Sequence, residues 1–77
     1  MKKIAYIALG SNLDNPKKQV QTARYWIAET ALTTIVSESS LYETVPLGSQ
    51  DQPNYINQVI AVETQLSAHD LLKTLFF

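Results

Sequence analysis

The chain has 77 residues, the size of one small domain with a marginally sufficient hydrophobic core. Hydrophobic residues make up 45% of the chain and charged residues 17%, a balance that excludes an intrinsically disordered protein. The net charge is −1, and the six basic and seven acidic residues are scattered, which excludes the basic stripe of a nucleic-acid-binding protein.

Cysteine is absent, which excludes a disulfide framework and thiolate chemistry and fits a reducing compartment. Lys2 and Lys3 are followed by an apolar run at residues 4–9 that is too short for a secretory signal. No segment approaches the roughly 20 apolar residues of a membrane span. We therefore predict a soluble, cytoplasmic protein with neither a membrane nor a nucleic acid as partner.

The first predicted element is a strand at residues 4–9. These residues are apolar on both faces and stop at Gly10, a pattern typical of a buried central strand that enters a turn. Asn15 and Pro16 then indicate a helix start, with asparagine as the N-cap and proline at the first helical position. Apolar residues at helical spacing are predicted to face the sheet, namely Val20, Ala23, Ile27 and Ala31.

Two further strands follow. Residues 33–44 are rich in β-branched residues and serine but alternate poorly, which predicts an edge strand. A loop punctuated by Pro46, Gly48 and Pro53 leads to a second strong strand at residues 55–64. One face of that strand is predicted to carry Ile56, Ile60 and Val62. The other face is predicted to carry Tyr55, Asn57, Val59 and Ala61.

A last helix begins at Ser67 and Asp70, which fit a capping box, and its predicted apolar stripe is Leu71, Leu72, Leu75 and Phe76. His69, at its second position, is expected to face solvent. The order β-α-β-β-α predicts an α+β fold with an antiparallel, ferredoxin-like sheet that lacks the final strand of that plan. The helix reaches Phe77 without a C-cap signal, so residues 1–77 are interpreted as a fragment of a larger domain.

The loop at residues 45–54 is the strongest functional signal. Ten residues is long for a hairpin, and long loops in compact domains tend to be functional, although a plain connection also fits this composition. Tyr55 and Asn57 are predicted to share the inward face of the strand at the loop mouth. Thr44 and Leu47 can present backbone N–H and C=O groups. An aromatic ring, a carboxamide and backbone groups suit a flat, hydrogen-bonding heterocycle.

Other patterns of chemical interest are weak. Gly10, Ser11 and Asn12 are similar to a phosphate-binding turn, but a lone glycine without a following Gly-Lys also fits a turn that starts a helix. The seven carboxylates form no Asp-x-Asp pair, and Arg24 is the single arginine. The residues therefore predict no metal site, no cationic clamp and no catalytic residue for phosphoryl transfer in this chain.

Three runs carry a resemblance to a known family: AYIALGSNL at residues 5–13, YETVPLG at residues 42–48 and QDQPNYIN at residues 50–57. In this order and spacing they resemble hydroxymethyl-dihydropterin pyrophosphokinase of folate biosynthesis. The resemblance covers nearly the whole chain but only about the first half of the family's domain. It implies transfer of pyrophosphate from ATP, with Mg²⁺, to the hydroxymethyl group of 6-hydroxymethyl-7,8-dihydropterin, which releases AMP.

The resemblance also implies which residues bind the pterin substrate. In the family, the backbone at the positions of Thr44 and Leu47, the ring at Tyr55 and the amide at Asn57 hold the pterin. Val45 stands where the family usually has proline, and valine can supply the same apolar contact. The resemblance further places the turn Gly10, Ser11 and Asn12 in a mobile loop near the site.

The family's Arg-rich segment, its Asp-x-Asp pair for magnesium and a second aromatic beyond the pterin have no counterpart in this sequence. We therefore expect these 77 residues alone to be inactive. The alternative to an enzyme is a non-catalytic remnant that keeps at most a weak pterin half-site. A regulatory or RNA-binding ferredoxin-like domain would need a basic and aromatic strand surface that is lacking. Three strands in the order first, third, second would leave the outer edge of the first strand unpaired, and such an edge favours self-association.

Overall fold

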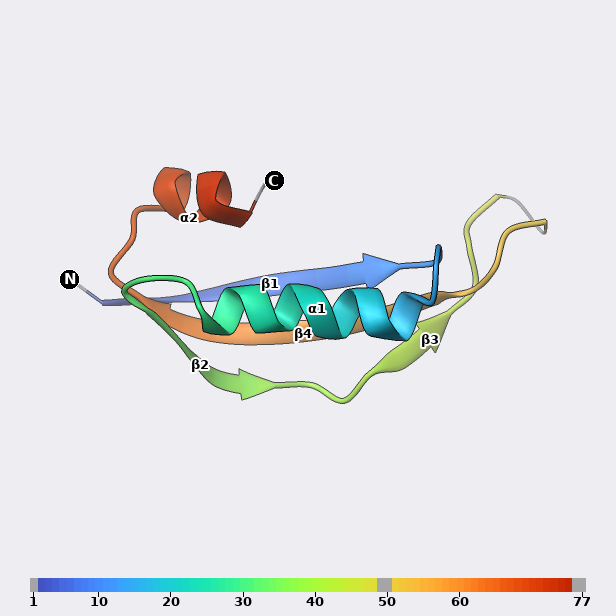
Figure 1. Ribbon diagram of the computed structural model, residues 1–77, viewed down its shortest axis with the longest axis horizontal. Helices are drawn as coiled ribbons and strands as arrows, with labels where there is room; N and C mark the ends of the chain where they lie inside the picture. Colours follow the sequence, from blue (N-terminus) through green and yellow to red (C-terminus); the bar gives the residue numbers. More distant parts are fainter. Residues whose placement is uncertain (1, 49–50, 76–77) are drawn as a thin grey trace.

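The computed structural model describes residues 2–48 and 51–75 and confirms the α+β class. Four strands and two helices follow one another along the described chain (Figure 1). Their order is β1 (Lys3–Ser11), α1 (Pro16–Ala28), β2 (Thr33–Glu38), β3 (Tyr42–Thr44), β4 (Tyr55–Thr64) and α2 (Ala68–Leu75).

The sheet is antiparallel, and β4 is its central strand. β1 pairs with one side of β4 from Lys3↔Thr64 to Ser11↔Ile56, while β2 and then β3 pair with the other side. The expected strand order, with residues 55–64 between the other two strands, is confirmed, whereas the prediction that residues 4–9 form a central strand was wrong. β4 pairs along its length with β1 on one side and with the shorter β2 and β3 on the other.

The predicted single edge strand at residues 33–44 is divided in two. The register on β4 shifts between Ile35 and Ser37, which marks a β-bulge, and regular pairing stops at Glu38. Ser39 then makes two hydrogen bonds to β4 in place of regular strand pairing. Its N–H donates to the carbonyl of Val59 and its hydroxyl accepts the N–H of Val59, both at 2.9 Å. The poor alternation of this segment was the sequence signal of that break.

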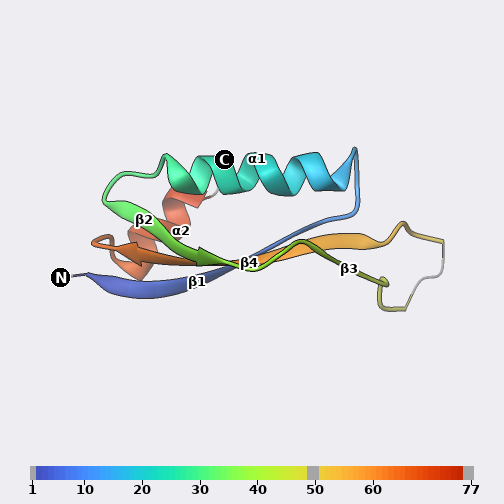
Figure 2. The ribbon, with the colours of Figure 1, turned by 90° about the horizontal axis from the view of Figure 1, so that it is seen from below.

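Both helices lie on the same side of the sheet, as Figure 2 shows. The core beneath them joins Ile27 of α1, Ile60 and Val62 of β4 and Leu71 of α2. Val20 and Ile27 of α1 are buried as predicted, whereas Ala31 lies beyond the helix and is exposed. On α2, Leu71 is buried but Leu72 is 56% exposed, which corrects the predicted stripe, and Phe76 and Phe77 lie outside the described residues.

The two helix starts are held differently. α2 has the N-cap bond of the predicted capping box, since the N–H of Asp70 donates to the Ser67 hydroxyl at 3.1 Å. α1 does begin at Pro16 with Asn15 at the cap position, but Asn15 has φ 60° and makes no side-chain cap bond. An N-cap residue typically has a β-region backbone, which Asn15 does not have. His69 is exposed, as predicted.

Candidate functional site

Tyr55 and Asn57 begin β4 and share one face of it, as their spacing predicted. Both are half-buried. The face is not the inward one, however, because the residues under the helices are Gln58, Ile60, Val62 and Thr64. The helices cover that side because Ile60 and Val62 pack there against Ile27 of α1 and Leu71 of α2 to form the core. The aromatic ring and the carboxamide therefore lie on the sheet face opposite α1 and α2.

Thr44 joins Tyr55 and Asn57 on this face. It ends β3, where the register pairs Thr44 with Tyr55 and Tyr42 with Asn57. Directly opposite residues in a sheet point to the same side, so the Thr44 hydroxyl reaches its diagonal neighbour. Asn57 Nδ2 donates a hydrogen bond of 2.8 Å to Thr44 Oγ1. Sequence reasoning placed Thr44 at the site through its backbone and missed this role of its side chain.

The loop at residues 45–54 extends, in its described parts 45–48 and 51–54, beyond the end of the sheet (Figure 1). Its predicted site residues are open to solvent, with Val45 74% and Leu47 100% exposed. Gly48 has φ +79°, a left-handed conformation that favours glycine. Gln50, part of the third sequence run, lies outside the described residues. The apolar side chains of the loop are thus available to a ligand and are not part of the core.

Two side-chain hydrogen bonds tie this loop to the rest of the site. Asn54 Nδ2 donates to Glu43 Oε2 at 2.9 Å, which links the end of the loop to β3. Asn12 Nδ2 donates to the Pro53 carbonyl at 3.3 Å, which links it to the turn after β1. Residues 41 positions apart are brought together in this way, and no local pattern indicated the contact.

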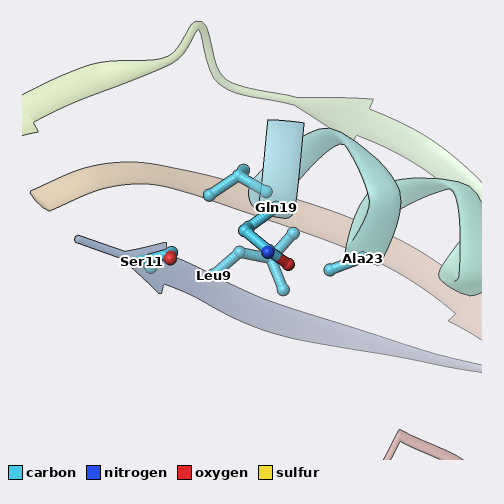
Figure 3. Close-up of a pocket in the computed structure, with 6 residues that line it drawn as sticks. Leu9, Ser11, Gln19 and Ala23 are labelled. Carbon is cyan, nitrogen blue, oxygen red and sulfur yellow. The ribbon is translucent and has the colours of Figure 1, made fainter. Parts of the chain in front are cut away.

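The turn Gly10, Ser11 and Asn12 is divided between two sides of the sheet. Gly10 is paired with Asn57 and faces the candidate site. Ser11 points instead toward α1, where Figure 3 shows it near Gln19 in a cavity of about 260 Å³. The Ser11 hydroxyl also accepts the N–H of Leu13 at 3.4 Å, a local turn bond. Gly10 and Asn12 are therefore the members of the turn that contact the candidate site.

The strongest electrostatic contact lies away from this site, between α1 and β2. Arg24 donates from Nε and Nη2 to the carboxylate of Glu38, with an Nη2–Oε2 distance of 2.6 Å. The hydrogen bond and charge of Arg24 lower the pKa of Glu38 below its ordinary value, and Glu38 raises the pKa of Arg24. The single arginine of the chain is thus engaged in a structural pair.

Buried Gln58 extends the same contact. Its Nε2 donates to Glu38 Oε1 at 3.2 Å and to the Ser39 carbonyl at 2.8 Å, while its Oε1 is buried without a hydrogen-bond partner. A glutamine between the apolar residues of β4 was the sequence signal for a buried polar group, and sequence reasoning did not use it. The group connects α1, β2 and β4 and lies on the helix side of the sheet.

Within residues 2–48 and 51–75, no three His, Cys, Asp or Glu side chains gather closely enough to hold a metal ion. Neither described helix has the length and apolar character needed to cross a bilayer.

Comparison with known proteins gives a family match. The model of the family 7,8-dihydro-6-hydroxymethylpterin-pyrophosphokinase (HPPK) matches residues 6–76. The chain is 49% identical over 71 residues to the 2-amino-4-hydroxy-6-hydroxymethyldihydropteridine pyrophosphokinase of Haemophilus influenzae, which covers 92% of this chain and 44% of that protein. It is 44% identical over 70 residues to the protein of the same name from Pseudomonas aeruginosa, covering 91% and 43% respectively.

A longer relative is also similar. The folic acid synthesis protein fol1 of Schizosaccharomyces pombe is 38% identical over 71 residues, which are 92% of this chain and 10% of that protein. The chain therefore spans less than half the length of these curated relatives.

Proposed function

The chain belongs to the 7,8-dihydro-6-hydroxymethylpterin-pyrophosphokinase family, and from that premise we propose that it carries a pterin-binding half-site. The half-site consists of Thr44, Val45, Leu47, Tyr55 and Asn57. The observation that carries the proposal is the placement of Tyr55 and Asn57 side by side at the mouth of the long loop. A planar pterin would stack on the ring and exchange hydrogen bonds with the carboxamide.

The loop completes the half-site. Val45 and Leu47 are exposed, so their side chains are open to a ligand. Asn12 and Gly10 bound the site on the β1 side, and the hydrogen bond from Asn12 to Pro53 holds the loop near the turn after β1. Two loops and two strands would therefore surround one edge of the heterocycle.

The reaction we assign to the family is transfer of pyrophosphate from ATP to 6-hydroxymethyl-7,8-dihydropterin, in the cytoplasm, for folate biosynthesis. ATP with Mg²⁺ would be the second substrate, but the described residues do not gather the carboxylates that hold magnesium. Arg24 is engaged by Glu38 and is not available as a clamp for phosphates. We therefore propose that these 77 residues bind pterin without turning it over.

A calorimetric titration with 6-hydroxymethyl-7,8-dihydropterin tests the half-site, with circular dichroism on the same sample to verify folding. We expect saturable binding that Tyr55→Ala or Asn57→Ala weakens severalfold. A folded sample without binding would overturn the half-site. An unfolded sample would support the alternative of an inert remnant. AMP formation that depends on pterin and on this purified chain would overturn the proposed lack of turnover.

We also propose that the outer edge of β1 associates with a second copy of the chain. Among the described residues, β1 is hydrogen-bonded to β4 on one side and to no strand on the other. Ile4 is 52% and Tyr6 77% exposed, and Lys3 is the one charged residue of the strand. A long edge with so little charge is the kind that pairs with another strand.

A further inference from the structure

We propose that Gly10 and Thr44 are positioning residues that hold the carboxamide of Asn57 in place for the ligand. Thr44 anchors the amide by a hydrogen bond, and Gly10 leaves the space in which the amide lies. The consequence for pterin binding rests on the proposed function, whereas the arrangement of the three residues does not.

Residue 10 is a glycine for a reason other than its backbone conformation. The two glycines of the chain differ in backbone conformation and surroundings. Gly48 has a positive φ, and a Cβ added there would meet nothing within 4 Å. Gly10 is the reverse case. It lies in regular pairing within β1 and does not have a left-handed backbone, so its conformation would accept other residues. The lack of a side chain at residue 10 is therefore explained by the space that it leaves beside β4.

The carboxamide of Asn57 occupies the space beside Gly10. A Cβ on Gly10 would lie 3.0 Å from Oδ1 of Asn57 and 4.0 Å from its Cγ. It would also lie 3.9 Å from Cδ1 of Tyr55, which is an ordinary contact. A 3.0 Å approach is too tight, so the amide would have to give way. The carboxamide of Asn57 thus lies against the backbone of β1 at the residue opposite to it.

The amide of Asn57 is not free to move away from β1. Its Nδ2 is bonded to Thr44 Oγ1 at 2.8 Å, so a shift away from β1 must lengthen or break that bond. β1 and β3 therefore constrain Asn57 from opposite sides. A methyl group at residue 10 of β1 would therefore disturb the Asn57 amide, which Thr44 of β3 holds from the other side.

A double-mutant cycle in thermal stability tests the arrangement without any ligand. Gly→Ala in a strand normally raises stability, so Gly10→Ala in an Asn57→Ala background should raise Tm by roughly 2–6 °C. In the wild-type background the same substitution should lower Tm, because the new Cβ meets Oδ1. Equal Tm shifts in the two backgrounds would overturn the proposal. Asn57→Ser removes the same oxygen and replaces Asn57→Ala if that variant does not fold.

Pterin titration then tests the consequence. Thr44→Val removes the hydroxyl at nearly constant shape, and we expect about tenfold weaker binding, with Thr44→Ser restoring most of it. Gly10→Ala should weaken binding similarly, whereas Ala8→Ser adds one atom on the same face of β1 and should not. Equal affinity of Thr44→Val and wild type would overturn the positioning role. If wild type does not bind, the proposed function fails, while the cycle in Tm still decides the arrangement.

Discussion

The guanidinium of Arg24 binds the carboxylate of Glu38 through two nitrogens, with Nε–Oε1 at 3.0 Å and Nη2–Oε2 at 2.6 Å. Arg24 lies on α1 and Glu38 is the last residue of β2, so the pair joins the helix to the edge of the sheet. The carboxylate also accepts from Gln58 of the central strand. Three elements therefore meet at one carboxylate, close to the point where β2 stops pairing.

This pair predicts an acid-dependent loss of stability. Because Arg24 lowers the pKa of Glu38 in the folded state, the pair stabilises the fold at a pH above the ordinary glutamate value of 4.5. That contribution should disappear as the pH falls below 4.5 and Glu38 becomes protonated. Thermal melts between pH 7 and pH 3 should show a smaller decline for Glu38→Gln than for wild type. Parallel Tm profiles of the two proteins would contradict the prediction.

The core predicts a large effect at Ile60, which is fully buried beneath the helices. Ile60→Ala should lower the free energy of unfolding by about 2–5 kcal/mol, since it removes buried apolar groups and leaves a cavity. The matched control is Ile4→Ala, because Ile4 is 52% exposed and its loss should cost less than about 1 kcal/mol. Urea denaturation of both variants measures the difference, and equal losses would mean that the core lies elsewhere.

The buried hydroxyl of Thr64 predicts that a change of polarity at constant shape lowers the free energy of unfolding. Thr64 is 2% exposed, its Oγ1 lies 2.7 Å from that of Thr33, and it accepts the N–H of Leu66 at 3.1 Å. Thr64→Val keeps the shape but leaves that N–H without its acceptor, so we expect a loss of about 1–3 kcal/mol in urea denaturation. Thr34→Val, at an exposed position of β2, is the control and should be nearly neutral. Equal changes would contradict this role of the hydroxyl.

The proposed half-site predicts that the ring of Tyr55 matters more than its hydroxyl. Stacking of a flat ligand needs the aromatic face, which Tyr55→Phe keeps and Tyr55→Ala removes. In a pterin titration we expect Tyr55→Ala to bind roughly threefold to tenfold more weakly, and Tyr55→Phe to bind within about twofold of wild type. A loss of affinity in Tyr55→Phe as large as in Tyr55→Ala would assign the contact to the hydroxyl.

The outer edge of β1, which pairs with no strand of the described part of the chain, predicts concentration-dependent association. Ala8 lies near the middle of the strand and is exposed, so Ala8→Lys would place a charge on the edge that pairs with a second copy. Sedimentation velocity should show wild type moving from monomer toward dimer as concentration rises, and Ala8→Lys remaining monomeric. Ala28→Lys adds the same charge on α1 and should associate like wild type. A wild-type chain that stays monomeric throughout would exclude association through this edge.

Much of the local structure could be predicted from the sequence. The alternation of β4 assigned Ile60 and Val62 to one face and Tyr55 and Asn57 to the other, and both assignments are confirmed. The N-cap bond from the Asp70 N–H to the Ser67 hydroxyl and the limits of the loop at residues 45–54 are confirmed as well. Each of these features depends on residues within a few positions of one another, so a short stretch of sequence contains the cause.

The candidate site could be predicted only in part. Tyr55 and Asn57 were placed together, but the anchoring hydroxyl of Thr44 and the fit of Asn57 against Gly10 were not foreseen. Both depend on which strands flank β4 and in what register. A one-residue change of register would turn the Thr44 side chain to the other face, and composition does not determine that register.

By itself, then, the sequence determined where the helices and the long strands form, which residues alternate along β4, and which family the chain belongs to. The strand order with residues 55–64 in the middle followed from the ferredoxin-like plan. The tertiary structure decided that residues 33–44 divide into β2 and β3, and that the helices cover Ile60 and Val62 and leave Tyr55 and Asn57 on the other side. The physical reason is the range of the interactions. Propensity, capping and alternation act between neighbours in the chain, whereas register and the choice of the covered face depend on burial shared by residues far apart in it.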